Sequence, residues 1–139
     1  MSVVCSNANV HDSRIPSYTN AMKPTTLAEL TDLVIRFRAE RDWAQFHTPK
    51  ELAISLVVEA AELLELLQWK QGEDLDKQIQ SKRQEIADEL GDVLHSILLL
   101  AHDLNIDLAA ATQSKLEKVA RKYPVEKAKG KPRKYDELD

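Results

Sequence analysis

Two apolar stretches of the sequence each carry a pair of acidic residues three positions apart. The first pair is Glu59 and Glu62, in SLVVEAAELLELLQW, and the second is Glu89 and Asp92, in EIADELGDVLHSILLLA. On an α-helix this spacing places both carboxylates of a pair on one side, ~5–6 Å apart at Cβ. If two such helices pack together, four carboxylates meet, and like charges ~5 Å apart repel by roughly 3 kcal/mol at an effective dielectric near 20. The sequence therefore predicts a helical bundle that holds a cation.

The composition favours a fold built from helices alone. With 139 residues the chain is long enough for one domain with a core. Three Gly and five Pro are few for an all-β protein, whereas the good helix formers Leu, Ala, Glu and Lys are plentiful. We expect an all-α protein.

Apolar periodicity and capping residues predict four helices. Thr26, Thr48 and Asp107 stand where N-caps are expected, and Thr48 is followed by Pro49 and by Glu51, as in a capping box. A polar break at 71–74 separates the second helix from the third. The expected helices span about 26–41, 49–70, 76–104 and 108–122.

Polar segments flank the predicted helices. Residues 1–24 are rich in Ser, Asn, Thr and Pro and predict a flexible leader, residues 25–124 form the all-α domain, and residues 125–139 form a basic C-terminal tail. Residues 115–134 hold nine of the 19 Lys and Arg, so this region is a local positive patch.

Several classes of protein are disfavoured by the sequence. The net charge of −4 gives no global basic field for nucleic acid. No apolar run approaches the ~20 residues that a membrane span needs. The single Cys5 forms no internal disulfide, and the N-terminus lacks the apolar core of a signal peptide. We expect a cytoplasmic protein that binds neither nucleic acid nor membrane.

The neighbours of the acidic pairs distinguish a metal site from a solvated face. An isolated pair of this kind most often lies on a solvated surface. Here, however, Glu59 and Glu62 share their face with Ser55, Val58 and Leu66 rather than with Lys or Arg. A second acidic stripe, which includes Glu89 and Asp92, borders the apolar side of the third helix. These settings favour a functional site.

Ligand chemistry narrows the choice of metal. Carboxylates without Cys or paired His favour magnesium (Mg2+), or manganese (Mn2+), over zinc. A di-iron site usually needs two Glu-x-x-His motifs, and only Asp92-x-x-His95 approximates one. Magnesium beside a basic segment implies a phosphorylated ligand.

Two tryptophans flank the acid-bearing second helix. Trp43 lies before it, in ERDWAQFH, and Trp69 lies at its end, in LLQWK. Packing in a core or interface would explain each tryptophan about as well as a functional role would. The sharper interpretation is that each stacks on a nucleobase.

The segments ERDWAQFHTPKELAISLVVEAAELLELLQW, Glu89-x-x-Asp92 and KYPVEKAKG together resemble the MazG-like all-α nucleoside triphosphate (NTP) pyrophosphatases, most closely the dCTP pyrophosphatase type. In that family ExxE and ExxD are separated by a spacer, which here has 26 residues between Glu62 and Glu89. The likeness extends from about residue 26 to the C-terminus. It implies a four-helix bundle-like protomer assembled as a homo-oligomer, either a homodimer or a homotetramer.

The resemblance also implies a reaction and a set of roles. The reaction is magnesium-dependent hydrolysis of dCTP or a modified pyrimidine triphosphate to the monophosphate and pyrophosphate, in nucleotide-pool cleansing. The metal ligands would be Glu59, Glu62, Glu89 and Asp92, and Glu59 or Glu62 would act on the attacking water. The implied base-binding residues are Trp43, His47 and Trp69, and the implied phosphate-binding residues are Lys115, Lys122 and Tyr123.

One position departs from the family pattern. Where relatives commonly have an asparagine ahead of the YPV motif, this chain has Val119, whose side chain forms no hydrogen bond. The sequence leaves the consequence of this change open, along with the preferred base and sugar and the number of metal ions. It also leaves open two other functions, a phosphoribosyl-ATP pyrophosphohydrolase and a non-catalytic helical interaction or regulatory module.

Overall fold

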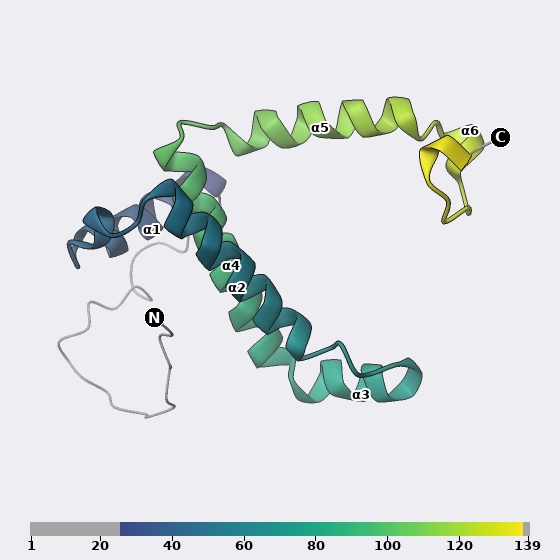
Figure 1. Ribbon diagram of the computed structural model, residues 1–139, viewed down its shortest axis with the longest axis horizontal. Helices are drawn as coiled ribbons and strands as arrows, with labels where there is room; N and C mark the ends of the chain where they lie inside the picture. The colour runs from purple at the N-terminus through teal and green to yellow at the C-terminus, as the bar shows by residue number, and fades with distance from the viewer. Residues whose placement is uncertain (1–25, 138–139) are drawn as a thin grey trace.

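The computed structural model describes residues 26–137, and in this range the chain forms helices and no strand (Figure 1). The predicted all-α class is confirmed. The predicted leader 1–24 lies outside the described residues. The elements are α1 (Leu27–Ala39), η1 (Trp43–Gln45), α2 (Pro49–Glu65), α3 (Gly72–Ser81), α4 (Arg83–Asp103), α5 (Leu108–Lys122), α6 (Val125–Ala128) and η2 (Tyr135–Glu137).

Three helices begin where their capping residues predict. The Thr26 side chain accepts a hydrogen bond from the Glu29 N–H at 3.2 Å, and the Glu29 carboxylate accepts one from the Thr26 N–H at 3.0 Å. This is the reciprocal capping box. At α2, Thr48 Oγ1 accepts from the Glu51 N–H at 3.2 Å, and at α5, Asp107 Oδ1 accepts from the Ala110 N–H at 2.9 Å. Each cap satisfies an N–H group that the helix itself leaves unpaired.

The predicted boundaries between the second and third helices are wrong. Helix α2 ends at Glu65 rather than near residue 70, and the supposed break at 71–74 contains the start of α3. Gly72 opens α3 with a φ of +52°, a conformation that glycine adopts without steric cost. Glu73 and Asp74 then lie in the first turn, where the helix dipole favours acids. A second interruption, at Lys82, separates α3 from α4.

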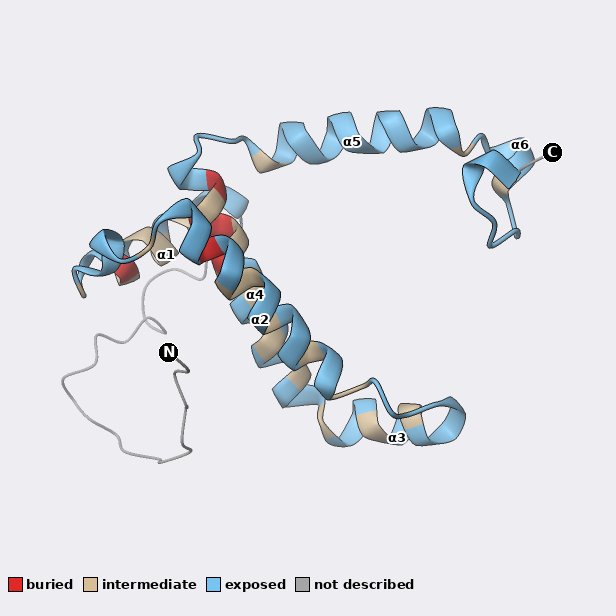
Figure 2. Ribbon diagram, viewed as in Figure 1, coloured by how far each residue is buried: buried red, intermediate tan, exposed pale blue. Residues whose placement is uncertain are grey.

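The core lies where three helices meet. Helices α2 and α4 pack along each other, and α1 crosses the C-terminal half of α4 (Figure 1). Buried positions of the ribbon gather at this junction (Figure 2). The buried hydrophobic residues of the described range are Leu52, Leu98, Leu99 and Ala101. Because α4 supplies three of these four residues, it is the central helix of the protomer.

Helix α5 projects away from this core instead of closing a four-helix bundle (Figure 1). Asn105 ends α4 in the left-handed region, with a φ of +53°, and the Ile106 N–H bonds back to the Ala101 carbonyl at 2.8 Å. This closing bond satisfies a terminal carbonyl and turns the chain. No residue of α5 is buried. The expected bundle is therefore not completed within one protomer.

No helix of the described range is by itself long and apolar enough to cross a membrane. Helices α4 and α5 reach the length and apolar composition of a membrane span only when they are taken together, and the two helices are bent relative to each other by 102°.

An ion pair ties α1 to α4. The Arg38 guanidinium donates two hydrogen bonds to the Asp103 carboxylate, at 2.7 and 2.8 Å, and its side chain is only 9% exposed. The bidentate geometry suits a planar guanidinium. The hydrogen bonds from Arg38 are the main cause that lowers the pKa of Asp103 below its usual range.

Replacing Arg38 with Ala should lower the free energy of unfolding by about 2 kcal/mol, because the fold loses two charge-assisted hydrogen bonds and the packing of a buried side chain. Since the pKa of Asp103 is lowered, the pair stabilises the fold above the ordinary carboxyl pKa, and this contribution disappears as pH falls well below about 4. Chemical denaturation across pH measures both effects. Arg36→Ala, an exposed cation on the same helix, should change stability little, and equal losses in the two variants would contradict the assignment.

Candidate functional site

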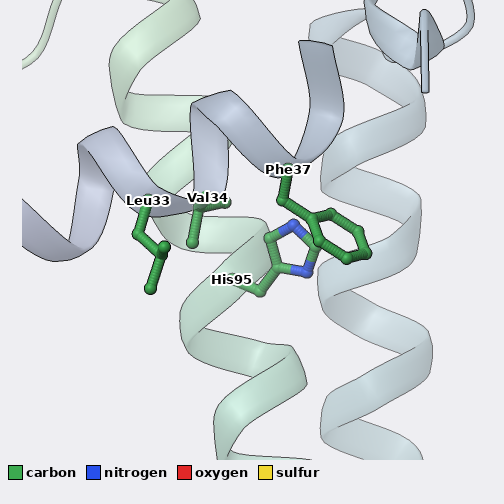
Figure 3. Close-up of a pocket in the computed structure, with 4 residues that line it drawn as sticks. All are labelled: Leu33, Val34, Phe37 and His95. Atoms are coloured by element: carbon green, nitrogen blue, oxygen red, sulfur yellow. The ribbon is translucent and has the colours of Figure 1, made fainter. Parts of the chain in front are cut away.

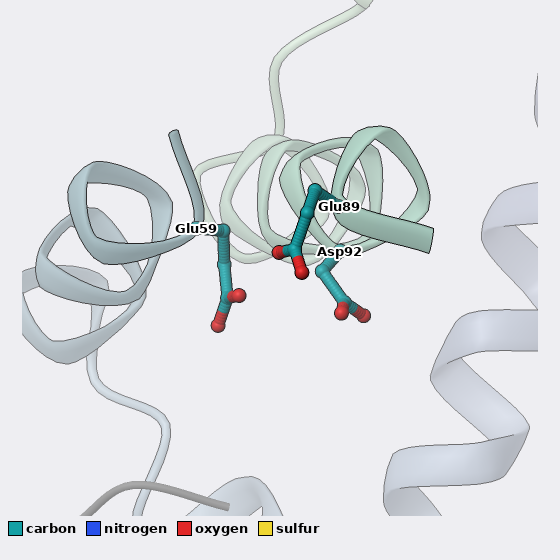
Figure 4. A group of neighbouring side chains, drawn as sticks. All are labelled: Glu59, Glu89 and Asp92. Carbon is teal, nitrogen blue, oxygen red and sulfur yellow. The ribbon is translucent and has the colours of Figure 1, made fainter. Parts of the chain in front are cut away.

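Three of the four predicted metal ligands lie together. Glu59 comes from α2, and Glu89 and Asp92 come from α4, and one carboxylate oxygen of each lies within 4.8 Å of the others (Figure 4). Glu89 and Asp92 share a helix face because they are three residues apart. Glu59 reaches them because α2 packs along α4. We call Glu59, Glu89 and Asp92 the acid triad.

The acid triad is electrostatically unfavourable without a cation. Burial is the main cause that raises the pKa of Glu59, and the charges of Asp92, Glu62 and Glu89 add to it. Burial also raises the pKa of Glu89, with Glu62 and Asp92 as the next causes. In addition, Glu89 Oε2 is buried and accepts no hydrogen bond from any residue that the structure describes. Desolvation and like charges both oppose ionisation of these groups, and a bound cation would reverse both effects.

Glu62 lies beside the acid triad rather than within it. Its carboxylate is exposed and is not among the three that converge. It is nevertheless close enough for its charge to raise the pKa of both Glu59 and Glu89. All four predicted acids therefore share one electrostatic neighbourhood, and Glu62 is its solvent-facing member.

Two serines lie at the contact between the acid-bearing helices. Ser96 is buried on α4, and its hydroxyl lies 3.4 Å from that of Ser55 on α2. Ser55 also hydrogen-bonds Glu59, which opposes the rise in the pKa of that carboxyl. Small hydroxyl side chains let the two helices approach without a bulky residue between them.

The donor set fits a hard divalent cation. All the converging atoms are carboxylate oxygens, which magnesium and manganese prefer. The unpartnered oxygen of Glu89 is an acceptor for which a cation is a natural partner. The residues present thus suit the predicted metal.

Two of the three predicted base-binding residues lie in an aromatic cluster near the α1 end of the site. The rings of Trp43 and His47 are 6.1 Å apart, and Trp43 meets Phe37 edge to face at 5.9 Å. His47 Nδ1 is buried without a hydrogen-bond partner, and burial, followed by the charge of Arg38, lowers the pKa of His47. The lowered pKa favours the neutral imidazole ring.

The sequence pattern did not single out two other members of this cluster. The Arg41 guanidinium lies 3.6 Å above the centre of the Phe37 ring. In the sequence, Phe37 continues the apolar period of the predicted first helix, and Arg41 lies at the predicted end of that helix. Phe37 and Arg41 are four residues apart and share one face at the end of α1. The left-handed Asp42, with a φ of +51°, then turns the chain so that Trp43 meets the Phe37 ring. The apolar periodicity of the sequence does not predict this turn at Asp42.

A small apolar pocket adjoins the aromatic cluster between α1 and α4. It has a volume of about 210 Å³ and is lined by Leu33, Val34, Phe37 and His95 (Figure 3). His95 follows Asp92 by one helical turn, so the pocket and the acid triad are neighbours along α4. Burial lowers the pKa of His95, which favours the neutral ring. His95 is part of this pocket wall, and its ring meets Phe37 at 6.1 Å.

The remaining predicted site residues lie elsewhere. Trp69 is 85% exposed and follows α2, whose 17 residues separate it from Trp43 by roughly 25 Å of helix. Lys115 and Lys122 are exposed on α5, and Tyr123 caps its end. Because α5 projects away from the α2–α4 pair (Figure 1), one protomer does not bring these residues to the acid triad.

Replacing Glu89 with Gln should raise the melting temperature of the metal-free protein by a few degrees at neutral pH, because one of several repelling, desolvated charges is removed. Because the pKa of Glu89 is raised in the folded protein, the protonated carboxyl does not destabilise the fold below the ordinary carboxyl pKa. The cost in free energy of unfolding appears as pH rises through the raised value and the carboxyl ionises. The gain in the variant should therefore vanish in acid.

Magnesium should stabilise the wild type by ligand linkage, and the same variant should lose most of that gain. Differential scanning calorimetry with and without magnesium measures both effects, and Glu117→Gln on α5 is the matched control. A metal response that is equal in Glu89→Gln and the wild type would rule out the acid triad as the site.

Comparison of the sequence with known proteins identifies the family to which this chain is related. Residues 54–138 match the MazG-like family. The chain is 36% identical over 137 residues to dCTP pyrophosphatase 1 of Rattus norvegicus, covering 97% of this chain and 81% of the rat protein. It is 40% identical over 129 residues to dCTP pyrophosphatase 1 of Homo sapiens, covering 91% and 76% of the two chains.

A solved structure agrees with these matches. The crystal structure of a pyrophosphatase from Archaeoglobus fulgidus superposes with a TM-score of 0.67 at 39% identity, covering 70% of this chain and 92% of that one. Family match, sequence identity and fold agree, and the matched segment includes the whole acid triad. The chain belongs to the MazG-like family.

Proposed function

We propose that the protein is a magnesium-dependent nucleoside triphosphate pyrophosphohydrolase that converts dCTP or a modified pyrimidine deoxynucleoside triphosphate to the monophosphate and pyrophosphate. The observation that carries the proposal is the acid triad, in which three carboxylates converge, Glu59 and Glu89 are half-buried, and one oxygen of Glu89 has no partner among the described residues. Relatives named dCTP pyrophosphatase 1 support the substrate class. Such a reaction suits nucleotide-pool cleansing, and a cytoplasmic location stays a prediction from the sequence.

In this proposal the metal ligands are Glu59, Glu89 and Asp92, with Glu62 beside them. Bound magnesium, or manganese, would neutralise phosphate charge and lower the pKa of a coordinated water. Glu62 is exposed next to the acid triad, which suits it to accept a proton from the attacking water. The water oxygen then bonds to the α-phosphorus, the bond from that phosphorus to its bridging oxygen breaks, and pyrophosphate leaves.

The base would lie against the aromatic cluster. Trp43, which is 39% exposed, offers a ring face to the base, and His47 lies beside it with ring centroids 6.1 Å apart. The adjacent apolar pocket has room for a small substituent on the base. Both features lie near the α1 end of the acid-bearing helices, so one nucleotide can reach them and the metal together.

We propose that a second copy completes the site and that the protein is a homodimer or a homotetramer. Helix α2 exposes Val57 by 69% and Leu64 by 57%, and α5 exposes Leu116 by 63%. An apolar groove of about 520 Å³ runs between α4 and α5, with Leu94 and Leu108 in its walls. Exposed apolar surface of this extent is typical of an interface. Helix α5 of the partner subunit would then carry the phosphate-binding side chains to the acid triad.

A substrate panel tests the reaction. Purified protein with magnesium should release pyrophosphate and the monophosphate from dCTP or a 5-modified dCTP faster than from dTTP, dUTP or phosphoribosyl-ATP. Glu62→Gln should reduce kcat about 100-fold or more, because general-base catalysis contributes this much. Activity on phosphoribosyl-ATP alone would point to the other pyrophosphohydrolase. No turnover by folded protein of any triphosphate would overturn the proposal and leave a binding module.

Mixed oligomers test the shared site. Glu89→Gln and Lys115→Ala should each be inactive alone. When the two variants are co-expressed, mixed dimers contain one site with neither defect, and about a quarter of the wild-type activity should return. If each site were built within one chain, mixing would restore nothing. The matched control is the pair Glu89→Gln and Asp92→Asn, whose defects fall in the same half of the site and should not complement each other.

A further inference from the structure

The C-terminal segment folds back onto the end of α5. Pro124 stops α5 and begins the short α6, after which Gly130 reverses the chain with a φ of +74°. The Lys131 N–H then donates to the Ala128 carbonyl at 3.0 Å, and the chain returns toward α5 (Figure 1). The predicted polar tail is thus an ordered hook attached to the phosphate-binding helix.

Tyr135 is the side chain through which this hook holds α5. Its ring meets that of Tyr123 edge to face, with centroids 6.0 Å apart and an interplanar angle of 85°. Lys122 Nζ lies 4.7 Å from the centre of the same ring, and Lys134 Nζ lies 5.9 Å from it. Asp136 pairs with Lys134 at 3.3 Å. One aromatic ring therefore contacts two neighbouring residues at the end of α5.

Lys122 and Tyr123 are two of the three residues proposed to bind phosphate. A lysine side chain has many rotamers, and fixing it on binding costs conformational entropy. An ammonium held over a ring face by cation–π attraction is already restricted, while its N–H donors on the opposite side stay available. The edge-to-face contact fixes the Tyr123 ring in the same way.

We propose that Tyr135 is a positioning residue that pre-orders Lys122 and Tyr123 for the triphosphate of the substrate. The inference rests on the proposed function, because it assigns those two residues to phosphate binding. The ring of Tyr135 acts through the two residues and touches no reacting atom. Its effect falls on affinity for the phosphate chain and not on the chemical step.

Two variants separate the ring from the hydroxyl. Tyr135→Ala removes both ring contacts, whereas Tyr135→Phe keeps an aromatic face and edge. Val125→Ala, at a 70% exposed position of α6, is the matched control for a truncation in the same hook. Three measurements apply to each variant: trypsin cleavage at the Lys and Arg of residues 127–134, calorimetric binding of inorganic tripolyphosphate in magnesium, and kinetics with dCTP.

Tyr135→Ala should be cleaved faster in the hook, bind tripolyphosphate about five- to tenfold more weakly, and show a matching rise in KM with kcat within about twofold of the wild type. Tyr135→Phe and Val125→Ala should behave as the wild type. Faster cleavage with unchanged tripolyphosphate affinity would overturn the positioning role. A Tyr135→Phe variant as weak as Tyr135→Ala would overturn the role of the ring.

The calorimetric measurement of tripolyphosphate binding tests the role of Tyr135 independently of whether the protein hydrolyses a triphosphate. If the wild type binds tripolyphosphate but hydrolyses no triphosphate, the reaction fails while the binding comparison still decides the role of Tyr135. If the wild type does not bind tripolyphosphate, the positioning role is overturned directly.

Discussion

The packing of α2 along α4 is the constraint on which the candidate site depends. The contact places Glu59 against Glu89 and Asp92, and it buries an oxygen of Glu89 that has no hydrogen-bond partner within residues 26–137. Folding must therefore bring like charges together at a cost in free energy. The apolar junction around Leu98 and Leu99 offsets that cost, and α1 completes the junction through its ion pair with Asp103.

The helix starts and the common face of the acidic residues could be predicted because they depend on residues only a few positions apart in the sequence. The caps at Thr26, Thr48 and Asp107 can be predicted because each is a single side chain that accepts a hydrogen bond from the N–H group three residues further on. The spacing of Glu89 and Asp92 fixes their common face once the helix forms. The convergence of Glu59 with them followed only from the expectation that two acid-bordered apolar faces would pack together. That expectation agrees with the acid triad, whereas Glu62 lies just outside it.

The features that could not be predicted depend on backbone turns or on contacts between distant residues. Gly72 begins a helix where a break was expected, because the same residue type that interrupts one helix can open another. Asp42 turns the chain so that Trp43 meets Phe37, and neither its sequence neighbours nor any period signals this turn. Tyr135 meets its partners because the chain reverses at Gly130. From composition alone, this C-terminal segment could be described only as a polar tail.

The bend after Asn105 has a consequence for how the protein would behave in solution. It sends the cations of α5 outward, away from the acids of their own chain. If those cations serve a neighbouring copy, as proposed, an isolated protomer holds two halves of different sites and no whole one. Catalytic competence then depends on protein concentration, and dilution below the dissociation constant of the assembly acts as an off switch that requires no inhibitor and no covalent change.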